Sequence, residues 1–254
     1  MELPTQKTVA IKSLDKFTML LFGQPKIGKS TLASHFPNTI FLATEPGHRY
    51  LEIWKIDINS WEDFLEAGAM LINEKGHKFQ TIVIDTIDNL LKFCEDYVCK
   101  KFSIKHPSDL GYAKGWTLLK SEFHRALRTL VASGFNTIFI SHQKETVITS
   151  QTVNFTKITN SLTASANKII TGMVDIIAYL GIEVVKDKNG DIVSEEHVLT
   201  TKTSPSLEVG ARGSASYVFP SEIIIPNPAT GNGYQAIVDA IKILNQTKTM
   251  KGGE

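Results

Sequence analysis

Eight consecutive residues, Gly23 to Ser30, have the types and spacing of a phosphate-binding loop. Their sequence, GQPKIGKS, matches the pattern G-x-x-x-x-G-K-[ST] at every required position. The glycines let backbone N–H groups face an anion, the Lys29 ammonium can reach the β- and γ-phosphates, and the Ser30 hydroxyl can ligate Mg²⁺. The predicted phosphate-contacting residues are Gly23, Gln24, Pro25, Lys26, Ile27, Gly28, Lys29, Ser30 and Thr31, the last of which can reach the α-phosphate.

The residues on either side of the loop support this interpretation. A strand-like run, TMLLF, precedes it, and a short helical segment, STLASHF, follows it and is stopped by Pro37. The alternative is a glycine-rich turn in which Lys-Ser is incidental, and that alternative does not explain why a strand and a helix flank the turn.

A second carboxylate is needed to hold Mg²⁺ through water, and it should end an apolar strand. Asp85 has that position at the end of TIVID, whereas Asp88 is the weaker candidate because it falls in the following helix. The alternative role for Asp85 is to cap that helix. The sequence therefore predicts a metal site made by Ser30 and Asp85.

Hydrolysis also needs a group that orients or deprotonates the attacking water. Glu45 ends the strand TIFLATE, the next one after the loop and its helix, although it can also be read as a turn residue in EPGH. Gln143 ends a later strand, NTIFISHQ, where an amide beside the γ-phosphate can report its presence. The neighbouring His142 is interpreted as a satisfied histidine at a strand end. Glu45, Lys29 and Gln143 form the predicted catalytic set.

Apolar runs alternate with helix-like stretches along the first 140 residues, which predicts a parallel sheet covered on both faces. Two helical stripes of apolar residues are expected to be core rather than partner sites. The strands are expected at Met19–Phe22, Ile40–Ala43, Ile82–Ile84 and Ile138–Ile140, and the stripes comprise Ile87, Leu90, Leu91, Cys94 and Val98, and Trp116, Leu119, Phe123, Leu127 and Leu130.

The second half of the chain has a different character. Residues Lys144–Lys168 are rich in Ser, Thr and Asn and predict a long mobile loop. The segments MVDIIAYLGIEVV and HVLTTKT, joined through an Asn-Gly turn, predict an antiparallel hairpin that extends the sheet. A last amphipathic helix follows. The expected organisation is one α/β domain over residues 1–245 and a flexible tail over residues 246–254.

Composition excludes several classes of protein. With 27 basic and 26 acidic residues the formal charge is +1, so no global field attracts the chain to nucleic acid or membrane. The two cysteines, Cys94 and Cys99, are spaced to point in different directions on one helix, which favours a reducing compartment. Neither a leader peptide nor a membrane-spanning run is recognisable, so we expect a soluble cytoplasmic protein.

These motifs together resemble the RecA-like branch of P-loop ATPases. In that branch the catalytic glutamate follows the strand after the phosphate loop, and a glutamine ending a later strand couples the nucleotide to a DNA-binding loop. More narrowly, the chain is similar to the phage and prophage RecA-core nucleotide-binding proteins, which have an AAA-type ATPase domain and act as single-strand annealing recombinases. The motifs that carry the likeness are GQPKIGKST, FLATEPG, TIVIDTIDNL, HPSDLGYAKGW, TIFISHQ and GARG.

The resemblance implies a RecA-like fold, ATP and Mg²⁺ as ligands, and a homo-oligomer in the cytoplasm of a bacterial host. It also implies single-stranded DNA and a single-strand-binding protein as partners. Lys202 and Arg212 fall on the late hairpin, where such proteins place basic residues that reach a neighbour's γ-phosphate; the alternative is two solvated basic residues. The segments Ser103–Trp116 and Lys144–Lys168 match two DNA-facing loops, and the expected phosphate contacts to DNA are Lys100, Lys101, Lys105, Lys144, Lys157 and Lys168.

The chain departs from larger recombinases in lacking a separate N-terminal DNA-binding domain and in having a single aromatic residue, Phe155, in the second loop. Two other functions share the nucleotide motifs. One is an ATP-dependent accessory factor, such as a helicase loader, that acts on a protein. The other is a small-molecule kinase, disfavoured because the four arginines are scattered rather than grouped on a lid.

Overall fold

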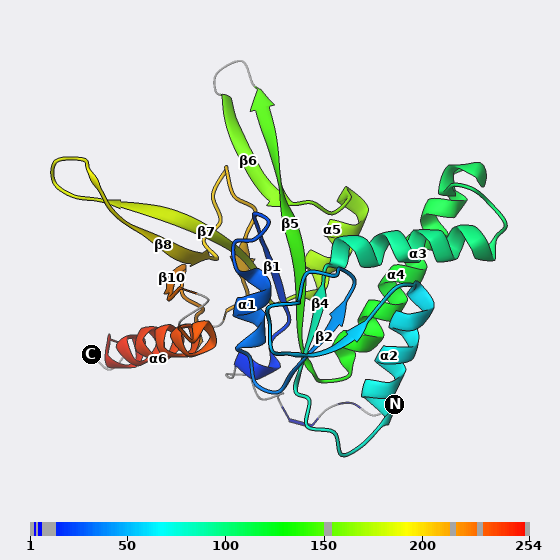
Figure 1. Cartoon of the computed structure of the whole chain (residues 1–254), viewed down its shortest axis with the longest axis horizontal. Helices are drawn as coiled ribbons and strands as arrows, with labels where there is room; N and C mark the ends of the chain where they lie inside the picture. The colour runs from blue at the N-terminus through cyan, green and yellow to red at the C-terminus, as the bar shows by residue number, and fades with distance from the viewer. Residues whose placement is uncertain are drawn as a thin grey trace.

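A single mixed sheet organises the computed structural model, which describes residues 3, 5–6, 14–149, 154–213, 217–227 and 231–251. The strand order is β10-β8-β7-β1-β5-β4-β2-β3, with β6 paired to β5 and β9 paired to β7 (Figure 1). The strands are β1 (Met19–Gly23), β2 (Thr39–Ala43), β3 (Trp54–Asp57), β4 (Thr81–Asp85), β5 (Asn136–Thr149), β6 (Asn154–Asn160), β7 (Ile176–Lys186), β8 (Ile192–Thr200), β9 (Gly210–Ala211) and β10 (Glu222–Ile225).

The central strands run parallel, and their carboxyl ends meet at one edge of the sheet. Gly23 at the end of β1 lies opposite His142 in β5, and Asp85 at the end of β4 lies opposite Ala43 in β2. All residues of β1, β2 and β4 are buried. Continuous apolar runs of this kind are typical of parallel strands covered on both faces, so the predicted α/β architecture is confirmed.

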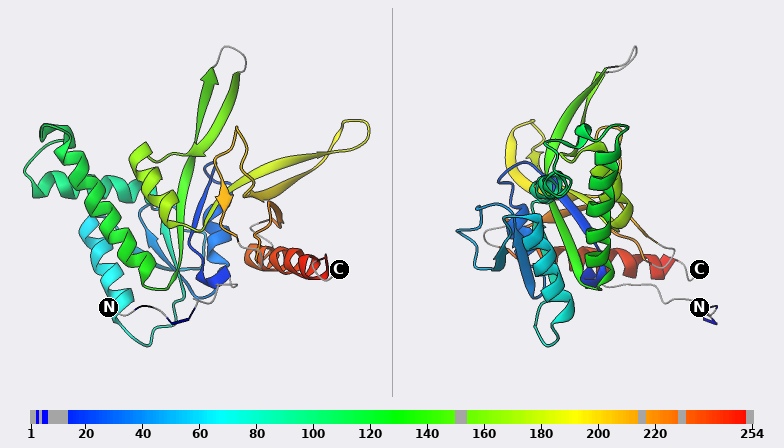
Figure 2. Two further views of the ribbon diagram at one scale, coloured as in Figure 1. Left: turned by 180° about the vertical axis from the view of Figure 1, so that it is seen from behind. Right: turned by 90° about the vertical axis from the view of Figure 1, so that its right-hand side faces the viewer.

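Helices cover both faces of the sheet (Figure 2). One apolar core lies between the sheet and α2, α3, α4 and α5, and the other lies between the sheet and α1 and α6. The helices are α1 (Lys29–Ser34), α2 (Trp61–Asn73), α3 (Ile87–Lys101), α4 (Lys114–Ala132), α5 (Ala164–Met173) and α6 (Gly233–Lys251), with short 3₁₀ turns at Leu14–Lys16 and Pro107–Asp109. Both predicted stripes join the first core, except that Trp116 is 41% exposed.

The antiparallel extension predicted for the late strands is present. β7 pairs with β8 in a hairpin, and β10 adds to β8. α6 continues to Lys251, so the segment expected to be a tail is helical up to that residue; its flexibility stays a prediction, and residues 252–254 lie outside the described residues.

The segment Lys144–Lys168 is not a long loop. β5 continues to Thr149 and pairs with β6, and the first turn of α5 follows. Most of the segment predicted to be a loop is therefore strand or helix. Residues 150–153 lie outside the described residues. The physical reason is that Thr, Val and Ile, which fill this stretch, favour a pleated strand even where the composition is polar.

The helices α3 and α4 extend past the sheet and meet at a tip formed by residues 102–116 (Figure 1). The tip is held by a tight backbone contact: a Cβ on Gly115 would lie 2.1 Å from the carbonyl oxygen of Pro107. Glycine is therefore required where α4 passes the 3₁₀ turn.

We predict that Gly115→Ala destabilises the protein by about 1–3 kcal/mol, because the added methyl group must push α4 away from the backbone of Pro107. Urea unfolding measures the change. Gly172→Ala in α5 is the matched control, since a Cβ there meets nothing within 4 Å and the helix gains about 0.5–1 kcal/mol. Equal effects of the two substitutions would contradict the role given to Gly115.

Candidate active site

The phosphate loop connects β1 to α1 and has the backbone that its glycines permit. Gly28 is the N-cap of α1 with φ 98°, a left-handed conformation that favours glycine. Gly23 lies against β7, where a Cβ would be 2.3 Å from the carbonyl oxygen of Leu180. Gly28 is therefore required by its backbone conformation, and Gly23 by its close approach to β7.

Lys29 lies inside the loop rather than in solvent. Its Nζ donates hydrogen bonds to the carbonyl oxygens of Gly23 at 3.0 Å and Gln24 at 2.7 Å. Burial lowers the pKa of Lys29, and the negative charges of Asp85, Asp88 and Glu45 oppose that shift. The Lys29 ammonium is therefore bound to the backbone of the phosphate loop, and three carboxylates favour its charged form.

Ser30 and Asp85 meet across the edge of the sheet, as predicted for the metal site. The Ser30 hydroxyl donates to Asp85 Oδ2 at 2.5 Å, and the same oxygen lies 2.8 Å from Nε2 of His48. A hydroxyl and a carboxylate are hard oxygen ligands of the kind Mg²⁺ prefers. In the part of the chain that the structure describes, His, Cys, Asp and Glu side chains form no cluster of three or more that could hold a metal. The donor set therefore fits an ion held mainly by phosphate and water.

Glu45 is fixed in place in the loop two residues after the end of β2. Its Oε1 accepts hydrogen bonds from the Thr86 hydroxyl at 2.9 Å and the Asn89 amide at 3.0 Å, and His142 Nε2 lies 3.5 Å away. The carboxylate is about one-third exposed. A carboxylate held by two donors and still open to water can orient or deprotonate a water molecule.

These groups surround one cavity of about 450 Å³. It has residues from the phosphate loop on one side and from the loop after β2 on the other. The lining residues are Pro25, Lys26, Gly28, Lys29, Ser30, Thr31, Glu45, Gly47, His48, Tyr50, Leu51, Asp85, Thr86 and His142. Gly23, Gln24 and Ile27 support the loop without lining the cavity.

Gln143 is not among the lining residues, so its role beside the γ-phosphate stays a prediction. Its amide nitrogen donates to Glu145 at 2.8 Å, and its oxygen accepts from the Tyr179 hydroxyl at 3.1 Å. Successive side chains of a strand point to opposite faces, so only one of His142 and Gln143 can face the cavity. That residue is His142.

Asp88, the weaker metal candidate, does not line the cavity either. Its Oδ1 accepts hydrogen bonds from two hydroxyls. One belongs to Ser141, the last buried residue of β5, and the other to Ser161, directly after β6. Asp88 therefore ties the base of the β5–β6 hairpin to the first turn of α3.

A second cavity, of about 580 Å³, adjoins the first and shares Glu45 and His48 with it. Its other side chains come from the loop after β2 and from β3 and the residues that follow, including Arg49, Lys55 and Asn59. Both cavities open at the carboxyl ends of parallel strands, where α/β proteins bind ligands.

The two predicted finger residues are placed elsewhere than expected. Neither lies on the β7–β8 hairpin: Lys202 follows β8, and Arg212 follows β9. The Arg212 guanidinium contacts Asp175 at 3.3 Å and the Gly172 carbonyl at 2.9 Å. Since Asp175 immediately precedes β7, this arginine lies at the end of the strand opposite to the phosphate loop.

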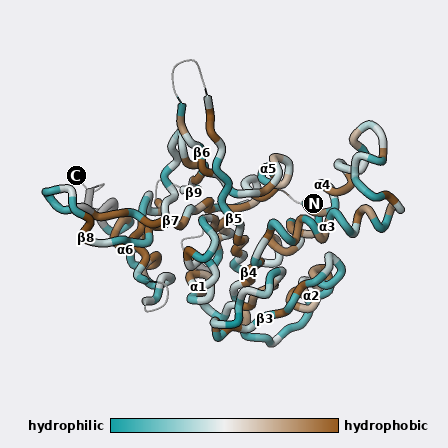
Figure 3. The backbone as a smooth tube through the Cα atoms, turned by 45° about the horizontal axis from the view of Figure 1, so that its top comes forward, coloured by the Kyte–Doolittle hydropathy of each residue, from teal (hydrophilic) through white to brown (hydrophobic). Residues whose placement is uncertain are grey.

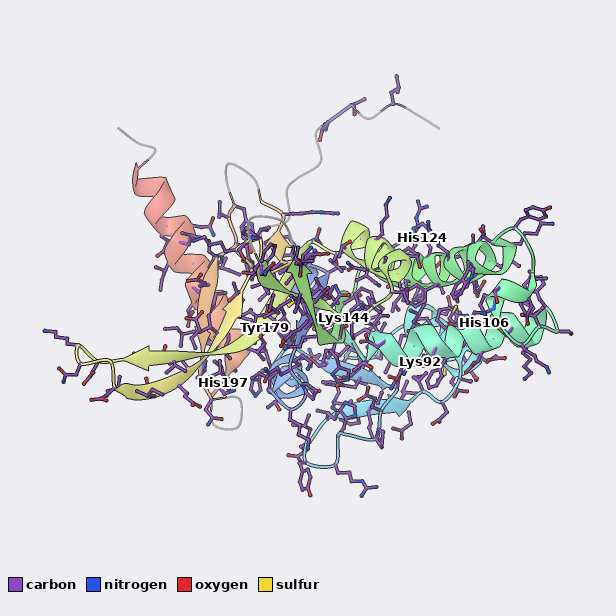
Figure 4. All side chains as sticks on the ribbon, turned by 90° about the horizontal axis from the view of Figure 1, so that it is seen from above. Lys92, His106, His124, Lys144, Tyr179 and His197 are labelled. Atoms are coloured by element: carbon purple, nitrogen blue, oxygen red, sulfur yellow. The ribbon has the colours of Figure 1, made fainter. Side chains whose placement is uncertain are left out.

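The predicted DNA-contacting lysines fall in two regions. Lys100, Lys101 and Lys105 are exposed at the end of α3 and in the tip, while Lys144 and Lys168 are exposed on β5 and α5. Figure 4 shows His106 at the distal end of the α3–α4 pair and Lys144 on the β5–β6 side of the molecule. Lys157 is different, because Glu208 pairs with it at 2.8 Å.

Sequence reasoning missed three residues of the site: His48, Asn89 and Tyr50. The signal for His48 was its place three residues after Glu45, in the loop at the end of β2. The signal for Asn89 was its spacing, since it lies in the first turn of the helix, four residues after Asp85. Tyr50 is fully exposed at the cavity, and its type alone gave no signal.

The fold and the site together define a P-loop nucleotide-binding ATPase domain. Residues 15–212 match the AAA domain family, so the chain belongs to that family. The chain is 28% identical over 145 residues to the SPbeta prophage-derived uncharacterized protein YorG of Bacillus subtilis strain 168, a match that covers 55% of this chain and 45% of that protein. The chain thus spans less than half the length of this curated relative.

Among solved structures, the chain is similar to a KaiC-like protein of the hyperthermophilic archaeon Pyrococcus horikoshii OT3. The TM-score is 0.45 at 14% sequence identity, with 86% of this chain and 88% of the other covered. Within the described ranges, no helix has the length and apolar character that crossing a membrane requires.

We predict that Asp85→Asn weakens Mg²⁺ binding to the nucleotide complex about 10–100-fold, because a carboxylate that orients the ion's water ligands is lost. Fluorescent ATP-analogue titrations with and without Mg²⁺ measure this effect. Asp88→Asn is the matched control, since Asp88 does not line the cavity. An unchanged Mg²⁺ dependence in Asp85→Asn would remove Asp85 from the metal site.

Proposed function

We propose that this protein hydrolyses ATP with Mg²⁺ and uses that reaction in DNA recombination, binding single-stranded DNA and promoting strand annealing. The observation that carries the ATPase part is the contact of Ser30 with Asp85 in the same cavity as Lys29 and Glu45. A loop, a metal carboxylate and a fixed second carboxylate are the parts that phosphoryl transfer to water requires.

In this mechanism the chain's own groups have separate tasks. Lys29 and the backbone of the loop bind the phosphates, and Ser30 with Asp85 would hold Mg²⁺, which would supply positive charge to offset that of the phosphates. Thr86 and Asn89 keep the Glu45 carboxylate oriented toward the cavity. Glu45 then accepts a proton from the attacking water.

The tip between α3 and α4 supports a role with single-stranded DNA. It combines exposed aromatic rings, on which bases can stack, with lysines that can contact phosphates. Tyr112 is fully exposed, and Phe102 and Trp116 are each 41% exposed. The neighbouring exposed lysines are Lys100, Lys101, Lys105 and Lys114. The relative YorG is a prophage-derived protein, and that origin is consistent with a phage recombination protein.

We predict that Glu45→Gln preserves ATP binding and lowers turnover at least about 100-fold, because the amide cannot accept the proton of water. Steady-state phosphate release measures turnover, and fluorescent-analogue binding measures affinity. The control is Glu52→Gln, which makes the same replacement of a carboxylate by an amide at an exposed residue of the same loop. Normal turnover in Glu45→Gln would exclude Glu45 as the base.

We predict that single-stranded DNA raises the ATPase rate and that the stimulation weakens steeply with salt, because phosphate contacts release counterions. Lys29→Ala should abolish the activity with and without DNA. Tyr112→Ala should weaken DNA binding about 5- to 150-fold, since stacking contributes about 1–3 kcal/mol per base, whereas Trp54→Ala, which removes an exposed aromatic on the edge strand β3, should not. An ATPase indifferent to DNA would instead favour a factor that acts on a protein partner, such as a helicase loader.

A phosphotransferase is the second candidate, and the cavity beside Glu45 is the observation that favours it. Arg49, Lys55 and Asn59 could bind an acceptor molecule there, with Glu45 between the acceptor and the phosphate loop. The same assay separates the candidates, since a kinase transfers phosphate to a nucleoside or nucleotide acceptor in the absence of DNA.

A further inference from the structure

His48 is the one buried residue of a loop whose other residues are exposed or half-buried. The loop from Thr44 to Ile53 joins β2 to β3, is described at every residue, and is mostly hydrophilic (Figure 3). His48 is 7% exposed, whereas its neighbours Gly47 and Arg49 are exposed. Burying a polar ring costs free energy unless the ring makes a hydrogen bond, so the partner of His48 indicates what the ring does there.

The ring of His48 contacts both β2 and the end of β4. Its centroid lies 5.5 Å from the ring centroid of Phe41 in β2, and its Nε2 lies 2.8 Å from Oδ2 of Asp85. An ionised carboxylate only accepts hydrogen bonds, so Nε2 carries the hydrogen and donates it to Asp85. The carbonyl oxygen of His48 accepts a hydrogen bond from the Leu51 amide at 3.1 Å, and this turn helps to fix the ring.

The two oxygens of the Asp85 carboxylate have different surroundings. Oδ2 accepts hydrogen bonds from the Ser30 hydroxyl and from His48. Among the residues that the structure describes, none donates a hydrogen bond to Oδ1, although Asp85 lines the nucleotide cavity. One oxygen is therefore held by the protein, which leaves the other for a ligand in the cavity.

Ser30 and His48 differ in what else they have to do. The Ser30 hydroxyl is itself an expected Mg²⁺ ligand, so it is not a dedicated partner for Asp85. Mg²⁺ prefers oxygen ligands, and the donating nitrogen of His48 is already directed at the carboxylate. Outer partners of this kind orient a metal ligand, and their loss typically lowers the affinity for the metal.

We propose that His48 is a positioning residue for Mg²⁺. Its Nε2 hydrogen bond orients the Asp85 carboxylate and thereby raises the affinity of the site for the ion. This inference rests on the proposed ATPase function and adds to it a residue that acts through Asp85.

The loop that carries His48 is also joined to the chain after β4 by other contacts. The Thr44 amide donates to the carbonyl oxygen of Asp85 at 2.8 Å, and the Glu45 carboxylate accepts from the Thr86 hydroxyl at 2.9 Å. Glu45 thus has anchors that do not involve His48. Loss of the His48 ring should therefore impair Mg²⁺ binding and leave Glu45 oriented.

The experiment compares two substitutions of His48 that differ in whether a donor is kept. Leucine fills buried space without a donor, and glutamine carries an amide N–H group on a side chain of similar reach. We expect His48→Leu to raise about 10-fold the Mg²⁺ concentration that half-saturates binding of a fluorescent, non-hydrolysable ATP analogue. His48→Gln should stay close to the wild type, and binding of the analogue in EDTA should be unchanged in both. The matched control is His124→Leu at an exposed residue of α4.

Two further measurements separate positioning from packing. In an Asp85→Ala background, His48→Leu should cause no further loss of Mg²⁺ affinity, because the proposed effect requires the carboxylate. Steady-state phosphate release by His48→Leu should recover the wild-type kcat at saturating Mg²⁺, because Thr86 and Asn89 still hold Glu45. The substitution should thus change the requirement for Mg²⁺ and not the turnover of the saturated enzyme.

A wild-type Mg²⁺ dependence in His48→Leu, or an equal loss in His48→Leu and His48→Gln, would overturn the inference. A lowered kcat at saturating Mg²⁺ with an unchanged Mg²⁺ dependence would also overturn it. A wild-type protein that fails to bind the analogue with Mg²⁺ would instead overturn the proposed function, and this inference with it. Circular dichroism shows whether each variant is folded, and His48→Met, an adaptable side chain without a donor, replaces His48→Leu where the latter does not fold.

Discussion

The hydrogen bond between Ser30 and Asp85 is the contact on which the organisation of the site depends. It joins the first turn of α1 to the end of β4, and β5 lies between β1 and β4 in the sheet. The bond can form only if the three strands are parallel and in register, so that their carboxyl ends reach the same edge. That edge then also receives Glu45 from β2 and His142 from β5.

Burial of the central strands explains why the edge of the sheet formed by their carboxyl ends can hold polar groups in fixed positions. Strands β1, β2 and β4 and the first half of β5 are buried, with one apolar core on each face of the sheet. Polar side chains at the strand ends are therefore the first residues beyond a continuous apolar layer. Their partners are one another: Asp85 has Ser30 and His48, and Glu45 has Thr86 and Asn89.

The sequence was sufficient for those parts of the fold that local pattern determines. The phosphate loop, the buried strands and the position of Asp85 follow from spacing and from continuous apolar runs. The β5–β6 hairpin was not predictable in this way, because a polar composition hid a strand that pairing stabilises. The choice between His142 and Gln143 depended on a one-residue alternation that the sequence leaves open. His48 and the exposure of Trp116 depend on tertiary contacts made by residues far apart in the chain.

The length of β5 has a mechanical consequence. It is one uninterrupted strand from Asn136 to Thr149, and His142, at the nucleotide cavity, lies at its middle. The outer half extends about 24 Å at about 3.4 Å per residue. The strand can therefore act as a lever that pivots near His142, and outside the cavity the carboxylate of Asp88 accepts hydrogen bonds from Ser141 and Ser161 at the base of the hairpin. A tilt of about 5° at His142 would carry the far end of such a lever through about 2 Å.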